Sequence, residues 1–476
     1  MAFNYLKLNF KKILEKMKIR VDSYEAGSGA IGGLATFHNN LFPRLVKRGY
    51  DVKTFSMKFR EDLPNREDYQ GVIVRRPSSP VDTDIAYAWI YDILHQMQID
   101  VDYLSPSELA YISHYFTRFA CVPSPYRMSL ADLFIPNDWM SFPRSALYAW
   151  MHSDLTQLVF IHSTEPGRCG GIVHTNYRGT SQNFNDIKQV NKGLWEGHRL
   201  IRDLEFQVPY KVLERQDSII MTVSKIHKKE YLLGVEAHGG KIGKITDRVF
   251  SVYHGVDVKS YKPMNVEKNE FKIGFIGRCS RAKGIDIIPK LAKILKNRIP
   301  VKFHIVTKTD KMNPYYFNLN RFVHENSLEN VIIDNTFYVG EEKIKLINSW
   351  DAVIVPSRYE PQGQVDLEAM SCGVPPLVGL GGLREKVIDG YDGVWINPND
   401  VEETAVVIVQ LYKGRYKDRS IEEIGKNARD SAEKIWDWEK RADAYKELTA
   451  YLYDSRIRGI KKDLLDLLLP TVDLKR

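Results

Sequence analysis

The stretch SRYEPQGQVDLEAMSCG, residues 357–373, contains two carboxylates, Glu360 and Glu368, and follows the apolar run DAVIVPS. The apolar run predicts a buried strand, and the residues around Glu368 predict a helix that begins after a Pro-Gln-Gly turn. Because residues seven or eight apart are separated by two helical turns, we expect both acids to face the same side. Taken alone, the pair fits a hydrolytic pair, a metal site, a clamp for a sugar and a ribose, or a solvated surface.

Strand and helix signals alternate on both sides of this stretch. In the second half, apolar runs predict strands at 271–277, 301–307, 331–335, 351–357 and 374–379, each followed by a helical stretch. In the first half, strands are predicted at 18–26, 52–57, 71–76, 131–139, 156–164 and 218–224, with a helix at 34–49 that Gly49 ends. Residues 80–130 break this rhythm, and we expect an irregular or helical insertion there.

The alternation predicts an α/β protein with two tandem Rossmann-like domains, each built on a doubly wound parallel sheet. We expect a basic amphipathic extension at 1–17, a first domain at 18–262 and a second domain at 263–435, with a polar linker at 262–270. Open parallel sheets bind ligands at the carboxyl ends of their strands, so the two domains are expected to face a cleft.

The bulk composition is that of a globular protein large enough for two domains. The 476 residues are 43% hydrophobic and 27% charged, with a net charge of +8. No run approaches eighteen apolar residues, and the N-terminus lacks the apolar region of a secretory signal. The four scattered cysteines indicate reduced, intracellular thiols. We therefore expect a cytoplasmic protein and no nucleic-acid partner.

Two loops at predicted strand ends have the composition of phosphate-binding turns. GSGAIGGLATF, residues 27–37, places Gly32 and Gly33 before a helix whose first amides favour negative charge. The alternative is an ordinary tight turn, since the spacing departs from GxGxxG. FIGRCSRAKGID, residues 275–286, offers Arg278 and Lys283 just before a helix expected near Gly284. A guanidinium fork and a lysine at such a position suit a diphosphate, and the alternative is a solvated basic turn.

Other strand ends supply further candidates. Gly381 and Gly382, in GLGGLRE at 379–385, are expected to offer free amides to phosphate or sugar oxygens. His162, in FIHSTEPGR, and Asp138, in PNDW, each end a strand of the first half and are expected to line the cleft. A hydrolytic pair has no need of an Arg/Lys cradle, and a metal site needs more acids or histidines nearby than this half shows.

Together and in this order, these elements resemble the retaining glycosyltransferases of the GT-B fold, namely the glycogen synthase-like and family four group. The specific part is PSRYEPQGQVDLEAMSCGVPPLVGLGGLREKVIDG, residues 356–390, and GRCSRAKGID and VYHGVDVKSYKP match weaker family patterns. WDWEKRADAYKELTAYLYD resembles the family's closing helix. The resemblance covers residues 18–453 and implies C-terminal helices at 436–476 that cross back to the first domain.

The resemblance implies a role for each matching position. Arg278 and Lys283 would neutralise the donor diphosphate, Glu368 would take the ribose hydroxyls, and Glu360 would face the transferred sugar. Backbone amides near the 362–364 turn would hold other sugar hydroxyls, and His162 would lie near the anomeric carbon. The implied catalytic residues are His162, Arg278, Lys283 and Glu360. The implied donor-binding residues are Gly32, Gly33, Arg278, Lys283, Gln362, Gly363, Gln364, Glu368, Gly381 and Gly382. Asp138 and Arg168 are the acceptor candidates.

The implied reaction moves a hexosyl unit, glucose first, from an ADP-, UDP- or GDP-hexose to a sugar or glucan acceptor. The resemblance implies no metal and no other cofactor. Alternatives are a same-fold disaccharide phosphorylase of the trehalose type, and a silent scaffold that kept the fold. A further alternative is transfer to a lipid-linked acceptor, for which the amphipathic segments 1–17 and 456–470 would contact a membrane peripherally. Homo-oligomerisation is left open. Where glycogen synthases carry Lys before the glycine pair, this chain has Ala30, followed by Ile31.

Overall fold

The chain folds into two compact units, each with its own parallel sheet. The computed structural model describes residues 17–29, 32–77, 79–99, 113, 115–168 and 199–453. Of these, the residues up to 168, 199–253 and 439–453 belong to the first unit, and 254–438 form the second.

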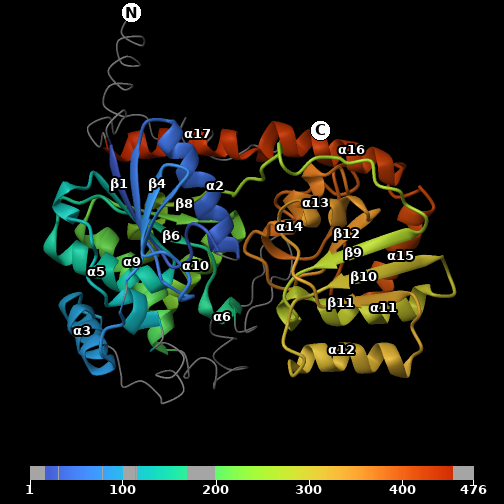
Figure 1. The fold of residues 1–476 in the computed structure, drawn as a ribbon, viewed down its shortest axis with the longest axis horizontal. Helices are drawn as coiled ribbons and strands as arrows, with labels where there is room; N and C mark the ends of the chain where they lie inside the picture. The colour runs from blue at the N-terminus through green and yellow to red at the C-terminus, as the bar shows by residue number, and fades with distance from the viewer. Residues whose placement is uncertain are drawn as a thin grey trace, which may run out of the picture. The chain divides into compact units, whose positions relative to one another are not determined.

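The sheet of the first unit has eight strands in the order β3-β4-β2-β1-β5-β6-β7-β8 (Figure 1). All neighbours pair in parallel except β3 and β4, which form an antiparallel hairpin at one edge. The strands are β1 Lys18–Ser23, β2 Asp51–Phe55, β3 Arg66–Tyr69, β4 Val72–Arg75, β5 Leu133–Asn137, β6 Leu158–Ile161, β7 Ile219–Thr222 and β8 Val249–Ser251. The sequence did not predict β3, because its residues REDY are polar and lie at the edge of the sheet.

Helices cover the sheet of the first unit. They are α2 Gly33–Lys47, α3 Thr83–Gln96, α5 Phe142–Met151, α6 Glu165–Arg168, α9 Arg199–Arg215, α10 Lys225–Ala237 and α17 Trp438–Tyr453. The expected helical insertion at 80–130 contains α3, a π-helical turn at Phe116–Ala120 and a 3-10 turn at Met128–Leu130. Helix α17 packs on α2, where Glu439 accepts from Arg44 at 2.8 Å and Asp443 accepts from Arg48 at 2.7 Å.

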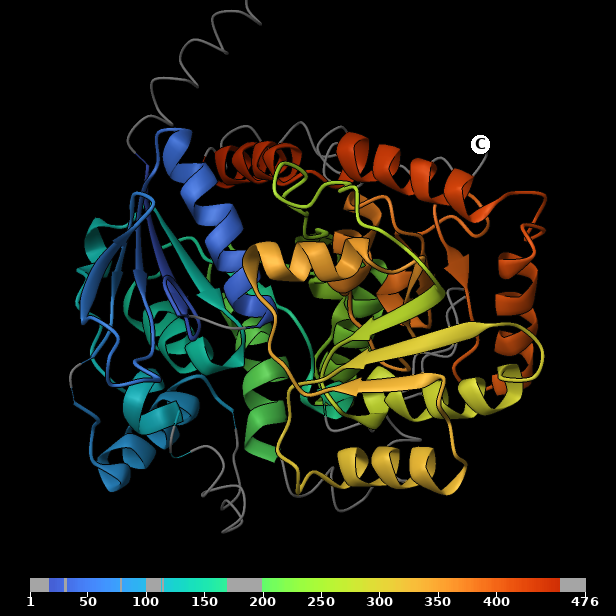
Figure 2. The same ribbon diagram turned by 45° about the vertical axis from the view of Figure 1, so that its right-hand side comes forward.

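The sheet of the second unit has six strands, all parallel, in the order β11-β10-β9-β12-β13-β14. The strands are β9 Phe271–Ile276, β10 Val301–Val306, β11 Val331–Asp334, β12 Ala352–Val355, β13 Pro376–Val378 and β14 Val394–Trp395. The helices are α11 Ile288–Leu295, α12 Pro314–Glu325, α13 Gly340–Asn348, α14 Val365–Ser371, α15 Val401–Tyr412 and α16 Ile421–Ser431. Helices α11 and α12 lie on one side of this sheet, and α14 and α16 lie on the other (Figures 1 and 2).

Helices on both faces explain why the strands read as apolar runs. Every residue of β6, β7 and β12 is buried, as expected for central strands of a doubly wound sheet. The helices carry their own start signals: Asn313 caps α12 ahead of Pro314, and Ser420 forms a capping box with Glu423 at α16. Local sequence and burial therefore specify the same elements.

The strand register brings the predicted site loops to one edge of each sheet. In the first unit, Ser23 of β1 pairs with Asn137 of β5, which pairs with Phe160 of β6. In the second unit, β12 lies between β9 and β13, so the loops that follow these three strands are neighbours. This edge is the one at which open parallel sheets bind ligands.

Candidate active site

In the second unit, the loops after β9 and β12 are fastened to each other. The guanidinium of Arg358 donates to both carboxylate oxygens of Asp286, at 2.6 and 3.0 Å. The backbone amide of Arg358 donates to the carbonyl of Ala282 at 2.8 Å. An ion pair with two hydrogen bonds fixes both the distance and the orientation of the two side chains. The loop that contains Arg278 and Lys283, called the basic loop below, therefore holds a defined position beside the 357–364 loop.

A left-handed glycine shapes the basic loop. Gly284 has φ +70°, and a Cβ on it would come within 1.9 Å of the carbonyl oxygen of Pro356, so only glycine fits. We expected a helix to begin near Gly284, but the surrounding residues form two 3-10 turns, and α11 begins at Ile288. The α-helix therefore begins about one turn later than predicted, and the left-handed Gly284 separates the two 3-10 turns.

Lys283 and Glu360 form an ion pair at the centre of this site. The lysine ammonium donates to Glu360 Oε2, and the two side chains are 23% and 11% exposed. Burial alone would raise the pKa of Glu360, but Lys283, aided by Lys386 and Arg278, lowers it below its ordinary value. Arg278 is exposed and acts on the same carboxylate, so the structure brings Arg278, Lys283 and Glu360 together.

Glu368 has a different cation as its partner. Its carboxylate pairs with Lys343 of α13, whose Nζ lies 2.7 Å from Oε2 and 2.8 Å from Oε1. Burial, together with Glu368, raises the pKa of the neighbouring Tyr261. We expected Glu360 and Glu368 to face the same side because of helical spacing, but Glu360 lies in the loop before α14, so the helical-spacing argument does not apply to it. Lys343 was not predicted, because nothing in its local sequence marks it as a partner.

The two glutamines of the 362–364 turn hold the segment that follows β8. Gln362 accepts from the backbone amide of His254 at 2.9 Å and donates to the His254 carbonyl at 3.3 Å. Gln364 Nε2 lies 3.1 Å from His254 Nδ1. These side chains therefore position the turn, whose backbone amides remain the predicted contacts for sugar hydroxyls.

The glycine turn after β13 packs against the same loop. The amide of Gly382 donates to the carbonyl of Glu360 at 2.9 Å, so the expectation of a free amide at Gly382 was wrong. A Cβ at Gly382 would meet the Pro361 carbonyl oxygen at 2.0 Å. This close backbone approach explains the glycine, and it places Gly381 beside the Glu360 loop. The role of Gly381 toward a ligand stays a prediction.

In the first unit, His162 is held at the end of β6 by Asn137 at the end of β5. Its Nε2 lies 2.5 Å from Asn137 Oδ1, and Asn137 Nδ2 donates to Ser23 Oγ at 2.9 Å. The ring packs edge-on against Phe37 of α2, with 4.8 Å between centroids. Burial, with a smaller effect of His227, lowers the pKa of His162 to about 3. The imidazole is therefore neutral at physiological pH and can donate or accept a hydrogen bond, but it does not supply positive charge.

Asp138, Gly32 and Gly33 lie at the same edge as His162, joined by Glu25. The Glu25 carboxylate accepts from the amide of Ala35, in the first turn of α2, at 3.3 Å. Burial raises the pKa of Glu25 to about 7, and Asp138 adds to this shift. A Cβ on Gly32 would lie 2.9 Å from Glu25 Oε2, whereas a Cβ on Gly33 would meet no atom of the described residues within 4 Å. Packing against Glu25 therefore explains why residue 32 is a glycine, whereas packing among the described residues gives no reason for a glycine at position 33.

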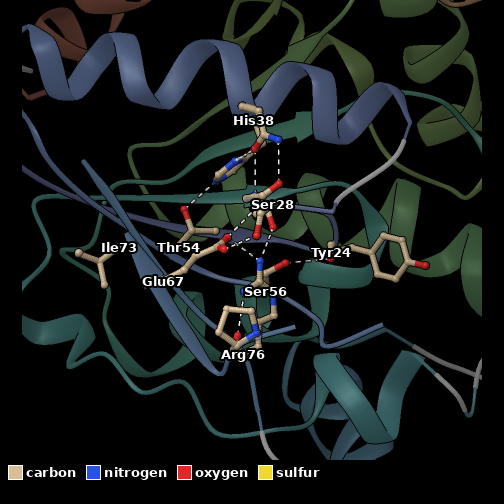
Figure 3. Close-up of polar contacts among 12 residues, drawn as sticks. Tyr24, Ser28, His38, Thr54, Ser56, Glu67, Ile73 and Arg76 are labelled. Atoms are coloured by element: carbon tan, nitrogen blue, oxygen red, sulfur yellow. Dashed lines mark hydrogen bonds and ion pairs between the residues drawn. The ribbon is translucent and has the colours of Figure 1, made fainter. Parts of the chain in front are cut away.

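A partly buried polar network fixes the start of the loop that begins at Gly27. Figure 3 shows Glu67 reaching both Ser28 and Arg76, and His38 reaching Thr54. Glu67 Oε1 accepts from the Ser28 amide at 2.9 Å and from Arg76 at 2.8 Å. Glu67 comes from the unpredicted strand β3, so this support for the loop could not be inferred from local sequence.

Several predictions fall on residues that the structure does not place. Ala30 and Ile31, the extension up to residue 16 and the segment 456–470 lie outside the described residues. Arg168 ends α6, and its role toward an acceptor stays a prediction. In the described ranges no group of three or more His, Cys, Asp or Glu side chains is arranged to hold a metal ion. No helix in the described part of the chain has both the length and the apolarity to cross a membrane.

Solved structures with the same architecture are glycosyltransferases. Sucrose-phosphate synthase from Thermosynechococcus elongatus superposes with a TM-score of 0.64 at 18% identity, covering 92% of this chain and 100% of that one. The catalytic domain of starch synthase IV from Arabidopsis thaliana, bound to ADP and acarbose, gives a TM-score of 0.61 at 14% identity, covering 92% and 99%. The two parallel-sheet units are thus those of the GT-B fold, as the sequence predicted.

The sequence comparisons match part of the chain to a family model and give glycosyltransferases as relatives. Residues 259–431 match the family model of Glycosyl transferases group 1. An uncharacterised glycosyltransferase of Methanocaldococcus jannaschii is 26% identical over 82% of this chain and 87% of its own length. Glycogen synthase of Mycobacterium tuberculosis is 23% identical over 69% and 70%. The second unit therefore matches the group 1 glycosyltransferases, and the resemblance of the chain to the glycogen synthase-like group is confirmed.

Proposed function

We propose that this protein transfers a hexosyl unit, with glucose as the first candidate, from a nucleoside diphosphate sugar to a sugar or glucan acceptor with retention of anomeric configuration. The observation that carries the proposal is the pair of Lys–Glu contacts at the carboxyl edge of the second sheet. Lys283 pairs with Glu360, and Lys343 pairs with Glu368. This arrangement supplies fixed cations for a diphosphate and oriented carboxylates for hydroxyl groups in one site.

Lys283 and Arg278 would act on the leaving group. When the bond between the anomeric carbon and the diphosphate breaks, negative charge develops on the phosphate oxygens. Cations already in place stabilise that charge more than they stabilise the bound donor, so they lower the barrier. The fastening of Arg358 to Asp286 keeps the basic loop in position and reduces the reorganisation needed when the charge appears.

The two carboxylates would bind neutral hydroxyls. Glu368, oriented by Lys343, would accept from the ribose hydroxyls, and Glu360 would accept from a hydroxyl of the transferred sugar. A lowered pKa keeps Glu360 ionised at physiological pH, which makes it an acceptor only. His162, neutral through burial, would offer a hydrogen bond near the anomeric carbon without adding charge.

The relatives bear on the donor and the acceptor. The starch synthase domain with a similar fold was solved with ADP and acarbose, and glycogen synthase is among the sequence relatives. These similarities support a nucleoside diphosphate donor and a glucan-like acceptor. The proposed chemistry uses side-chain cations throughout, so we propose that no metal ion is needed.

A binding panel followed by a transfer assay tests this proposal. The full chain is melted with ADP, UDP, GDP and their glucose esters, because a ligand that binds only the folded state raises the melting temperature. We expect one nucleotide series to raise it, and its glucose ester to release nucleoside diphosphate when maltooligosaccharides are added. Sugar phosphate formed from a disaccharide and inorganic phosphate, with no nucleotide effect, would instead establish the phosphorylase.

A further inference from the structure

Behind the 360–364 loop lies a fully buried ion pair that the proposed mechanism does not use. Lys386 Nζ lies 2.5 Å from Asp366 Oδ2, and both side chains are 0% exposed. Lys386 follows the glycine turn after β13, and Asp366 lies in the first turn of α14. Burying two charges is expensive, and a hydrophobic pair of similar size is often at least as stable. Stability alone therefore gives no reason for charged residues here.

Lys386 also makes a direct contact with the 360–364 loop. Its ammonium donates to the carbonyl oxygen of Gly363 at 3.0 Å. In a trans peptide the carbonyl and the following amide point in opposite directions, so the Gln364 N–H points away from the buried lysine. Residues 363 and 364 are only partly buried, and within the described residues the Gln364 amide has no protein acceptor. Lys386 thus turns this N–H outward.

The pair also acts on Glu360. The site of a Cβ on Gly363 is 3.4 Å from Glu360 Cγ, so the turned peptide and the Glu360 side chain are neighbours. Lys386 is one of the cations that lower the pKa of Glu360. Burial raises the pKa of Asp366 and lowers that of Lys386, and in each case the charge of the partner opposes the shift.

We propose that Lys386 and Asp366 are positioning residues for sugar selectivity: they fix the Gly363–Gln364 peptide so that one outward amide and the Glu360 carboxylate read adjacent hydroxyls of the transferred hexose. This inference rests on the proposed function, and it deepens it by assigning donor-sugar discrimination to a pair that touches no ligand. An amide that donates and a carboxylate that accepts, placed side by side, distinguish hydroxyls by the direction in which each hydroxyl points from the sugar ring. A donor with one hydroxyl inverted would leave one of these groups unpaired.

The test compares a charge-free replacement of the pair with the wild type. The double variant Asp366→Leu/Lys386→Met removes both charges together, so no lone buried charge remains. Asp366→Asn is a milder second variant that keeps size and a hydrogen-bond acceptor. Lys302→Met is the matched control, because Lys302 pairs with Glu270 at 2.7 Å on the surface, at the opposite end of the strands. The probes are the nucleoside diphosphate that binds the wild type, its glucose ester and its galactose ester.

We expect the double variant to melt near the wild-type temperature and Asp366→Asn, which leaves buried Lys386 without its counter-charge, to melt lower. Both should bind the free nucleoside diphosphate within threefold of the wild-type Kd. The ratio of kcat/KM for the glucose over the galactose ester should fall at least tenfold, which corresponds to about 1.4 kcal/mol. The control should keep the wild-type ratio. A merely structural role would change melting and nucleotide binding, but not this ratio.

A folded double variant that keeps the wild-type ratio and kcat/KM overturns the positioning role of the pair, and an Asp366→Asn variant with both values unchanged removes Asp366 from it. Loss of free-nucleotide binding in parallel with the ratio also overturns it, because the defect would then be general. The wild-type arm tests the proposed function separately. If the wild type binds the nucleoside diphosphates but transfers neither ester, the proposed function fails, whereas unchanged selectivity in an active variant removes only this inference.

Discussion

Lys343 on α13 holds the Glu368 carboxylate at 2.7 and 2.8 Å, although 25 residues separate them in the chain. This contact fixes the direction in which Glu368 can accept hydrogen bonds. The positive charge of Lys343 also offsets the cost of burying the Glu368 carboxylate, whose side chain is only 7% exposed. The orientation of the proposed ribose acceptor therefore depends on a neighbouring helix as well as on its own.

Replacing Lys343 should weaken nucleotide binding. In Lys343→Met the Glu368 carboxylate loses its orienting partner, and we expect the Kd for the nucleoside diphosphate to rise about tenfold. The free energy of unfolding should fall by about 1–3 kcal/mol, because a buried carboxylate is left unpaired. Isothermal titration calorimetry and urea unfolding measure the two effects. Lys345→Met is the control, since Lys345 lies on the same helix in an exposed pair with Glu341. Equal Kd values for the wild type and Lys343→Met would contradict the orienting role.

Gly33 should be required for the reaction but not for the fold. A Cβ there meets no atom within 4 Å in the part of the chain that the structure describes, and Gly33 is the first residue of α2. We expect Gly33→Ala to melt at or slightly above the wild-type temperature, because alanine favours helix by about 0.5–1 kcal/mol. Its kcat/KM should fall at least tenfold if a ligand approaches this backbone. Gly243→Ala, also free of close contacts, is the control. Full activity in Gly33→Ala would show that no ligand comes close.

Buried His38 should make the first unit sensitive to acid. Burial lowers the pKa of His38 to about 4, and its ring is held by Thr54 and Asn39. The unfolded chain binds this proton near pH 6.5 and the folded chain only near 4. Stability from the neutral ring is therefore complete above pH 6.5 and is lost as the pH falls toward 4.

For a pKa shift of His38 from 6.5 to about 4, the loss in free energy of unfolding as the pH falls is about 3 kcal/mol. Chemical denaturation of the wild type and His38→Gln between pH 4 and 7 isolates it from other groups, such as Glu25, whose raised pKa acts in the opposite direction. The difference in unfolding free energy between the two proteins should shrink by that amount as the pH falls. A constant difference would contradict a buried, neutral His38.

Metal removal should leave transfer unchanged. If Arg278 and Lys283 supply the positive charge for the diphosphate, activity in excess EDTA should stay within twofold of the untreated value. Initial rates with and without EDTA, followed by added Mg²⁺ or Mn²⁺, measure this. A loss in EDTA that a divalent cation restores would show that the side chains alone do not carry the charge.

The sequence predicted both sheets well, because central strands covered by helices on both sides read as apolar runs. It missed β3, whose residues REDY lack an apolar face, although Glu67 of that strand supports the glycine loop. It also missed β8 and β14, which are three and two residues long. Short or polar edge strands are defined by their neighbours, and a local pattern does not reveal them.

For the site, strand ends and glycines pointed to the loops but not to their supports. Lys343, Asp366 and Lys386 lie on or beside helices, and their partners are distant in sequence, so no spacing rule identifies them. The glutamates at 360 and 368 were paired through a helical repeat, but the chain turns at Gly363, where φ is +87°, before α14 starts. Tertiary pairing, rather than periodicity, decides which groups meet.

The central claim is that fixed cations beside Glu360 draw the diphosphate away from the sugar. The most direct measurement is kcat/KM for the preferred nucleotide sugar in Arg278→Ala and Lys283→Ala, with Lys290→Ala, an exposed lysine of α11, as the control. The account predicts that each site variant stays folded and loses about 10²–10³-fold, as when a transition-state donor is removed. The control should match the wild type. Wild-type rates in both site variants would contradict the account.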